Sequence, residues 1–264
     1  MRFVRLPAAQ VAVHLVGLTA LVATFAVPPA KGFQSPELAR IVVVHLPAAL
    51  LTVGFLIAAT IQAFRYLGNE DPLVDEKHAA LIECTALLGA LALGTGIVFS
   101  RYQWGDWWHW DPRQTSFLLV MLMLGASLVL RSALTDRARR AKVTAIYSAA
   151  TLLPNLFLIF VFPRLPQIKE VSLHPSQTVA ATVDRSQQGF DSNYQLALLV
   201  MLVGAGIATW HLYRTRRCLL TRQRELENLH AELDAHRFDS TGRPVARPVA
   251  YASQGSEGPP TNGS

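Results

Sequence analysis

The sequence predicts an all-α polytopic membrane protein, a bundle of six transmembrane helices. Of its 264 residues, 51% are hydrophobic and only 16% are charged, whereas soluble domains carry about 25% charged residues. The apolar residues form six blocks, each long enough to cross a hydrocarbon layer of about 30 Å as a helix. Helices satisfy their own backbone hydrogen bonds in lipid, and the short alternating segments of a β-barrel are not seen. The six blocks are residues 11–27, 41–64, 79–99, 116–134, 143–162 and 194–213.

The charge pattern orients these helices. The net charge of +6 could by itself suggest a nucleic-acid ligand. However, 17 of the 24 Lys and Arg residues fall on the inner side if the N-terminus is cytoplasmic. This asymmetry follows the positive-inside rule and predicts an N-in, C-in protein. We therefore expect the basic excess to meet the lipid bilayer, and we expect no nucleic-acid partner.

Three parts are expected along the chain. Residues 1–215 form the six-helix membrane domain, which has a long outer loop at 164–193. Residues 216–238 repeat leucines at sevenfold spacing and predict a cytoplasmic amphipathic helix. It could lie at the membrane surface, dock on a partner or be a solvated extension of the last transmembrane helix. Residues 239–264 are rich in Gly, Pro, Ser and Thr and predict a disordered tail.

Four of the five tryptophans lie within residues 104–110, in an outer segment spanning 101–115. An aromatic belt at the membrane surface is one explanation, but belts scatter one or two tryptophans per helix end. This density favours a stacking surface for a large planar ligand. If the segment is helical, one face carries Trp104, Trp107, Trp108 and Asp111, with Trp110 and Asp106 pointing elsewhere.

The residues after the tryptophans predict the start of the fourth transmembrane helix. Asp111 can cap that helix, and Pro112 is tolerated at its first position. Gln114 would complete a capping box. The tryptophans would then be attached to a rigid element.

Two histidines are candidates for metal ligation on the outer side. His45 lies about one turn into the second block, where a polar group is costly without a partner and where Pro47 disturbs helical hydrogen bonding. His174 lies in the long outer loop. Two neutral imidazoles can fill both axial positions of a haem iron. Cations that could bind the haem propionates on the same side are Arg101, Arg113, Arg164 and Lys169.

The sequence gives weaker indications of function for the other histidines and for the cysteines. We expect His78, in a predicted inner loop at 65–78, to lie at the surface, as should His230 and His236. A second haem site formed by His14 and His211 is an alternative to ordinary interfacial roles. The two cysteines form no CxxC, so neither a disulfide framework nor covalent haem attachment is expected. Glu83, near the inner end of the third helix, should be reachable by water.

The segment Trp104-Gly-Asp-Trp-Trp-His-Trp-Asp-Pro-Arg-Gln-Thr115 resembles the tryptophan-rich signature of the haem-handling proteins of cytochrome c assembly. Six helices, His45 before Leu-Pro-Ala-Ala, and His174 in the last outer loop resemble the haem exporter protein C family, over roughly residues 10–215. The Asp111-Pro112 form is also close to the cytochrome c synthase subunit of the other assembly system. Those proteins usually have more helices.

The resemblance implies a function. In this family the outer segment and two histidines hold haem b transiently, and the haem passes to a periplasmic haem chaperone. ATP-binding and membrane subunits of an ABC transporter, with a small membrane subunit, associate in the bacterial inner membrane. His45 and His174 would be the iron ligands, and the surrounding contacts would come from Trp104, Trp107, Trp108, Trp110, Asp111 and Arg113. The chain has no GxxxxGK[ST] motif, so any ATP use belongs to a partner, and we expect haem handling rather than an enzymatic reaction.

Three alternatives remain open. A cytochrome c synthase-type protein would deliver haem directly to apocytochrome. A b-type cytochrome would pair histidines on facing helices, which the loop position of His174 disfavours. A permease without a cofactor would be colourless.

Overall fold

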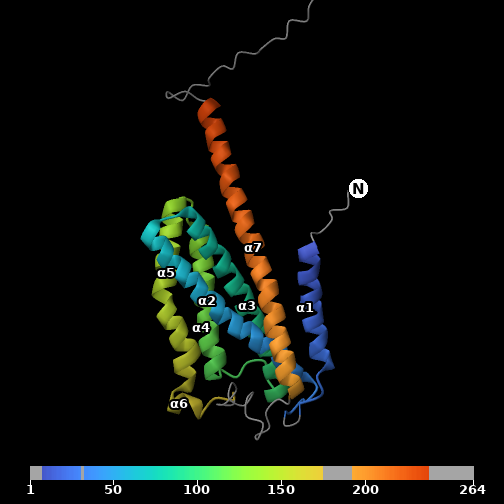
Figure 1. The fold of residues 1–264 in the computed structure, drawn as a ribbon. Helices are drawn as coiled ribbons and strands as arrows, with labels where there is room; N and C mark the ends of the chain where they lie inside the picture. Colours follow the sequence, from blue (N-terminus) through green and yellow to red (C-terminus); the bar gives the residue numbers. More distant parts are fainter. Residues whose placement is uncertain (1–7, 31–32, 175–191, 238–264) are drawn as a thin grey trace, which may run out of the picture. The chain divides into compact units, whose positions relative to one another are not determined.

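The computed structural model describes residues 8–30, 33–174 and 192–237. Over these ranges the chain is helical, without a strand. The helices are α1 (Ala8–Ala26), α2 (Val42–Asn69), α3 (Pro72–Trp104), α4 (Pro112–Ala133), α5 (Arg137–Leu156), α6 (Pro166–Lys169) and α7 (Ser192–Arg237) (Figure 1). A 3-10 turn, Leu38–Ile41, leads into α2. A π-helical turn, Phe157–Val161, and a 3-10 turn, Phe162–Arg164, extend α5.

The all-helical membrane fold is confirmed. Among the described residues, five helices are long and apolar enough to cross a membrane, and a shorter apolar helix covers Val11–Ala26. The five run over Leu38–Asn69, Pro72–Trp104, Pro112–Ala133, Arg137–Arg164 and Ser192–Leu233. Each covers one of the last five blocks of the sequence, except that Pro112–Ala133 ends one residue before the block 116–134 does. The N-in orientation stays a prediction.

The helices are longer than the apolar blocks, and the predicted inner loop at 65–78 is wrong. Helix α2 ends at Asn69, where Glu70 takes a left-handed backbone conformation with φ 51°. Asp71 then caps α3 by accepting a hydrogen bond from the Leu73 N–H at 2.9 Å. The helix boundaries are thus set by capping residues rather than by the loss of apolar character: Glu70 ends α2 and Asp71 begins α3.

His78 is therefore not a surface residue, contrary to the sequence prediction. It lies in α3 with 1% of its surface exposed, and its Nε2 is 2.8 Å from the Ser148 hydroxyl of α5. At the same end of the bundle, both arms of the Arg131 guanidinium donate to the Asp75 carboxylate at 2.8 Å. Polar side chains thus tie α3 to α4 and α5 at the end opposite Trp104.

Helix α7 covers both the last predicted span and the predicted amphipathic segment as one element. Glu83, which we expected to be open to water, pairs with Arg216 of α7. Farther toward the start of α7, a Cβ atom at Gly204 would lie 2.9 Å from the Ala20 Cβ, so α1 and α7 approach closely there. The division at residue 216 stays a prediction, and the predicted tail at 239–264 lies outside the described residues.

Candidate functional site

The tryptophan-rich segment is a turn between α3 and α4, not a helix. Trp104 is the last residue of α3, and Gly105 follows with φ 95°. A left-handed glycine at this place stops a helix, because other residues pay a steric cost there. The predicted shared helical face of Trp104, Trp107, Trp108 and Asp111 is therefore wrong. The chain instead turns back, and the Ser100 hydroxyl donates to the Asp106 carbonyl at 2.9 Å.

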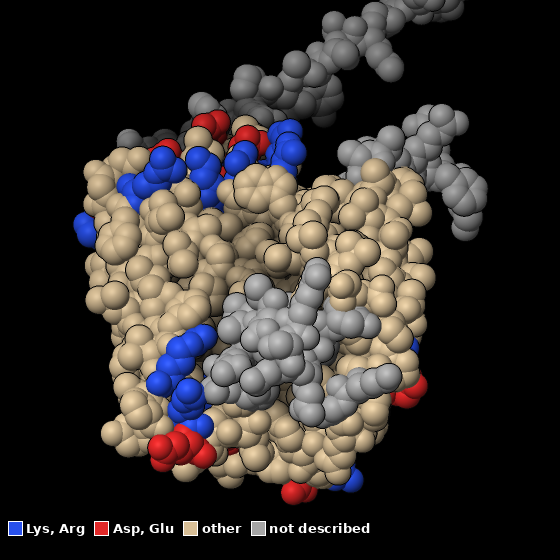
Figure 2. All heavy atoms as spheres, turned by 60° about the horizontal axis from the view of Figure 1, so that its bottom comes forward, with Lys and Arg blue, Asp and Glu red and all other residues tan. Residues whose placement is uncertain are grey.

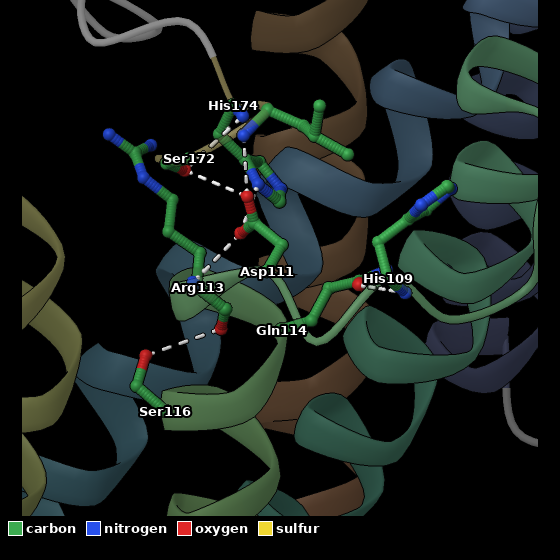
Figure 3. A network of polar contacts seen from close by, with 8 residues as sticks. His109, Asp111, Arg113, Gln114, Ser116, Ser172 and His174 are labelled. Carbon is green, nitrogen blue, oxygen red and sulfur yellow. Dashed lines mark hydrogen bonds and ion pairs between the residues drawn. The ribbon is translucent and has the colours of Figure 1, made fainter. Parts of the chain in front are cut away.

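Helix α4 starts as predicted, but its capping box does not form. Asp111 is the N-cap and Pro112 the first helical residue. In a capping box the Gln114 side chain would accept from the Asp111 N–H. Its Oε1 instead accepts from the His109 N–H at 3.2 Å (Figure 3). Gln114 thus holds the turn before the helix rather than the cap itself.

The Asp111 carboxylate is the centre of the site (Figure 3). One oxygen accepts from the Arg113 N–H and from His174 Nδ1, each at 2.8 Å. The other accepts from the Ser172 hydroxyl at 2.9 Å and from the Leu173 N–H at 2.6 Å. A residue with 3% of its surface exposed therefore fastens the outer loop to the start of α4.

These contacts keep Asp111 ionised. Burial by itself would raise the pKa of Asp111. The hydrogen bond and charge of His174, with the hydrogen bonds from Arg113 N–H and the Ser172 hydroxyl, outweigh burial and hold that pKa below its usual value. An ionised carboxylate only accepts hydrogen bonds. His174 therefore carries its proton on Nδ1, and in the neutral imidazole the lone pair lies on Nε2.

His45 is held in the same tautomer by a different acceptor. Its Nδ1 is 2.9 Å from the Ala92 carbonyl and 3.2 Å from the Thr95 hydroxyl, both on α3. A carbonyl cannot donate, so Nδ1 carries the proton and Nε2 keeps its lone pair. The ring lies against Gly96, where an added Cβ would be 3.0 Å from Cε1 of His45.

Helix α3 brings the two imidazoles to the same half of the bundle. His45 rests on Gly96, and the His174 ring centroid is 4.8 Å from that of Trp104. Gly96 and Trp104 are eight residues apart, about 12 Å along a helix.

The tryptophans have unequal surroundings. Trp104 packs edge to face against Phe99, His109 and His174. Trp107 is 55% exposed and Trp110 is 73% exposed. Trp108 contacts Trp110 edge to face at 5.8 Å. Among the tryptophans of the described residues, Trp104 is the one whose ring packs against a candidate ligand, His174. The exposed rings remain available to a large external molecule.

The candidate cations differ in a similar way. Arg101 donates to the Gly105 carbonyl and so braces the turn. Arg164 donates to the Phe160 carbonyl at 2.9 Å. Both its guanidinium and the Asp111 carboxylate act electrostatically on Arg113, so the Asp111 carboxylate balances part of the positive charge there. With this end turned forward, a short column of basic side chains ends beside acidic ones, and mostly uncharged surface separates it from a mixed group of basic and acidic side chains at the far edge (Figure 2).

Three contributors could not be identified from the sequence. Gly96 is one glycine among several in an apolar block, and only the structure shows the imidazole against it. Ser172 and Gln103 lack a motif. Gln103 donates to the Ser35 carbonyl at 2.8 Å and accepts from the Ser35 N–H at 3.1 Å. These two hydrogen bonds hold the loop between α1 and α2 against the end of α3.

Together these features define a polytopic helical membrane protein that presents two imidazoles and a tryptophan-rich turn at one end of its bundle. Its sequence matches the family described as Heme exporter protein C over residues 2–230. The chain belongs to that family, which confirms the resemblance seen in the sequence.

Individual relatives agree. The Heme exporter protein C of Bradyrhizobium diazoefficiens is 28% identical over 204 residues, covering 75% of this chain and 74% of the relative. That of Paracoccus denitrificans is 28% identical over 160 residues, covering 57% and 66%. That of Escherichia coli K12 is 30% identical over 114 residues, covering 43% and 46%. The aligned part thus spans from under half to three quarters of these relatives.

Proposed function

We propose that this protein holds haem b transiently at the outer face of the bacterial inner membrane, for c-type cytochrome biogenesis. The iron ligands are Nε2 of His45 and Nε2 of His174. One observation carries the proposal: both imidazoles use Nδ1 to donate to a fixed acceptor, which leaves both Nε2 lone pairs for a metal. A porphyrin supplies the four equatorial nitrogens, so two axial imidazoles complete the coordination.

The supports behind the ligands fit this role. Metal-ligating histidines generally donate their other N–H to a carboxylate or a carbonyl, which fixes the ring and raises its basicity. His174 has the carboxylate of Asp111 and His45 has the carbonyl of Ala92. The carboxylate is the stronger acceptor, since its hydrogen bond is charge-assisted. His174 therefore has the stronger hydrogen-bond support of the two ligands.

The tryptophans and arginines around the two histidines are suited to a haem that is bound only transiently. The exposed rings of Trp107 and Trp110 offer apolar area for the porphyrin or for a receiving protein, and Trp108 lies beside them. Arg113, with Arg164 near it, offers positive charge for a propionate. Binding at an interfacial turn leaves one side of the ligand accessible.

We propose the partners on the ground of family membership. Haem would pass to a periplasmic haem chaperone. The ATP-binding and membrane subunits of an ABC transporter, with a small membrane subunit, would associate with this chain and drive release. In this proposal the chain itself coordinates and hands over haem, and catalyses no reaction.

The proposal is tested by the haem content of the detergent-purified full chain. His45→Ala and His174→Ala should each lower the Soret absorbance per protein, because each removes an axial ligand. His230→Ala is the matched control, since it removes an imidazole of α7 to which the proposal gives no role. Equal Soret absorbance in all three variants would refute the ligand assignment. Trp107→Ala combined with Trp108→Ala should reduce haem or chaperone binding without blocking membrane insertion.

A further inference from the structure

We propose that Trp104 is a positioning residue that fixes the plane of the His174 ring, rather than a shelf on which the porphyrin stacks. This inference rests on the proposed function, in which His174 ligates iron. It differs from the expectation drawn from the sequence, which assigned all four clustered tryptophans to contact with the ligand.

The first support is the set of rings around Trp104. Its centroid lies 5.7 Å from Phe99 at 87°, 6.2 Å from His109 at 77°, and 4.8 Å from His174 at 72°. Edge-to-face pairs at such distances are attractive and directional. Three protein rings therefore occupy the surroundings of this indole, whereas Trp107 and Trp110 are more than half exposed.

The second support is the freedom that Asp111 leaves to His174. The carboxylate holds the imidazole at one atom, Nδ1. A ring held at one atom can still pivot about that hydrogen bond, and the direction of the Nε2 lone pair then changes. The indole of Trp104, packed against the ring at 4.8 Å, blocks part of this motion. The hydrogen bond to Asp111 and the packing against Trp104 together fix the plane of the His174 ring, which the hydrogen bond alone does not.

The third support is the rigidity of Trp104 itself. It ends a helix of 33 residues. Phe99 backs it one turn earlier, and Phe33 packs edge to face on Phe99 at 6.2 Å. The neighbouring Gln103, with 6% of its surface exposed, clasps Ser35 by two hydrogen bonds. Contacts from Phe33 and Ser35, in the loop between α1 and α2, thus hold the last turn of α3 in place. Trp104 is part of that turn and therefore restrains the His174 ring packed against it.

The test compares Trp104→Leu, Trp104→Phe and the matched control Trp210→Leu, in which an exposed tryptophan of α7 is changed. Each purified full-length variant is loaded with ferric haem and examined by optical and electron paramagnetic resonance spectroscopy. We expect Trp104→Leu to convert part of the low-spin signal to high-spin, because His174 no longer points steadily at the iron. Added imidazole should restore the low-spin signal by replacing His174.

The other variants sharpen the test. Trp104→Phe keeps an aromatic edge and should stay mostly low-spin, with broader g values than the wild type because the smaller ring restrains His174 less. Trp210→Leu should match the wild type. If Trp104→Leu does not accumulate in the membrane, the g values of Trp104→Phe decide, and g values identical to the wild type would overturn the inference.

Three outcomes contradict the proposal in different ways. Unchanged low-spin spectra in Trp104→Leu would show that Asp111 alone orients His174. Loss of haem that imidazole cannot restore would assign Trp104 to porphyrin contact. A wild-type protein without a two-imidazole spectrum would instead overturn the proposed function, and this inference with it.

Discussion

The contact between Gly96 and His45 allows a sharp test of the site. In Gly96→Ala the new Cβ would lie 3.0 Å from Cε1 and 3.3 Å from Nδ1 of His45. Carbon atoms pack best at about 3.5–4.0 Å, so the imidazole must move by a few tenths of an ångström. Such a shift strains the 2.9 Å hydrogen bond to the Ala92 carbonyl. That bond contributes about 0.5–1.5 kcal/mol, and its loss predicts about 2- to 12-fold weaker haem binding.

Gly94→Ala is the matched control. It adds the same methyl group to the same helix two residues earlier, where nothing lies within 4 Å of the new Cβ. Differences in helix propensity therefore cancel between the two variants. The assay is a haem titration of each detergent-purified protein, with the dissociation constant read from the Soret band. Equal constants for Gly96→Ala and Gly94→Ala would refute a role for the His45 position in haem binding.

Further predictions concern the two ends of the bundle. Asp111→Asn keeps a residue that can cap α4 but removes the negative charge beside His174. The midpoint potential of bound haem should therefore rise in a potentiometric titration, and haem affinity should fall about 10-fold or more. An unchanged midpoint potential would count against the carboxylate's role. Because the pKa of Asp111 is lowered on folding, its stabilisation is present above its unfolded pKa of about 3.9 and is lost only as pH falls further. The stability difference between wild type and Asp111→Asn should therefore persist at pH 5, and a difference that vanishes by pH 5 would contradict the lowered pKa. His78→Ala should lower the free energy of unfolding by about 1–3 kcal/mol, since Ser148 loses its buried partner, and thermal melts should show this with haem affinity unchanged. Removing Arg131 alone, as Arg131→Met, should destabilise by about 3–5 kcal/mol by leaving the Asp75 charge unpaired, and the double variant Arg131→Met, Asp75→Leu should recover most of that loss in the same melts.

The spans were predictable because they depend on composition. An apolar block of sufficient length crosses the bilayer whatever its neighbours are. The start of α4 was also predictable, since Asp111 and Pro112 form a local signal that needs no tertiary contact. The spans depend on burial of apolar residues in lipid, and the start of α4 depends on the residues at its own N-terminus.

The errors have two physical origins. His78 was expected at the surface because it fell in the predicted inner loop at 65–78, but helical hydrogen bonding continues past the apolar block and buries it against Ser148. The four residues of the tryptophan-rich segment were given one face on the condition that the segment is helical, but the left-handed Gly105 ends the helix at Trp104. Spacing cannot show which chain segment will pack against a residue.

The site itself was only half predictable. The sequence indicated His45 and His174 by residue type and by side of the membrane. It could not show that each donates through Nδ1, because the acceptors are 47 and 63 residues away in the chain. The tautomers that free Nε2 are thus a property of the fold.

The most direct measurement of the central claim is the electron paramagnetic resonance spectrum of the wild-type protein loaded with ferric haem. Two axial imidazoles give a six-coordinate, low-spin iron, so we predict a low-spin signal that accounts for the bound haem. A dominant high-spin signal would mean that at most one histidine reaches the iron, and would contradict the claim that His45 and His174 grip it together.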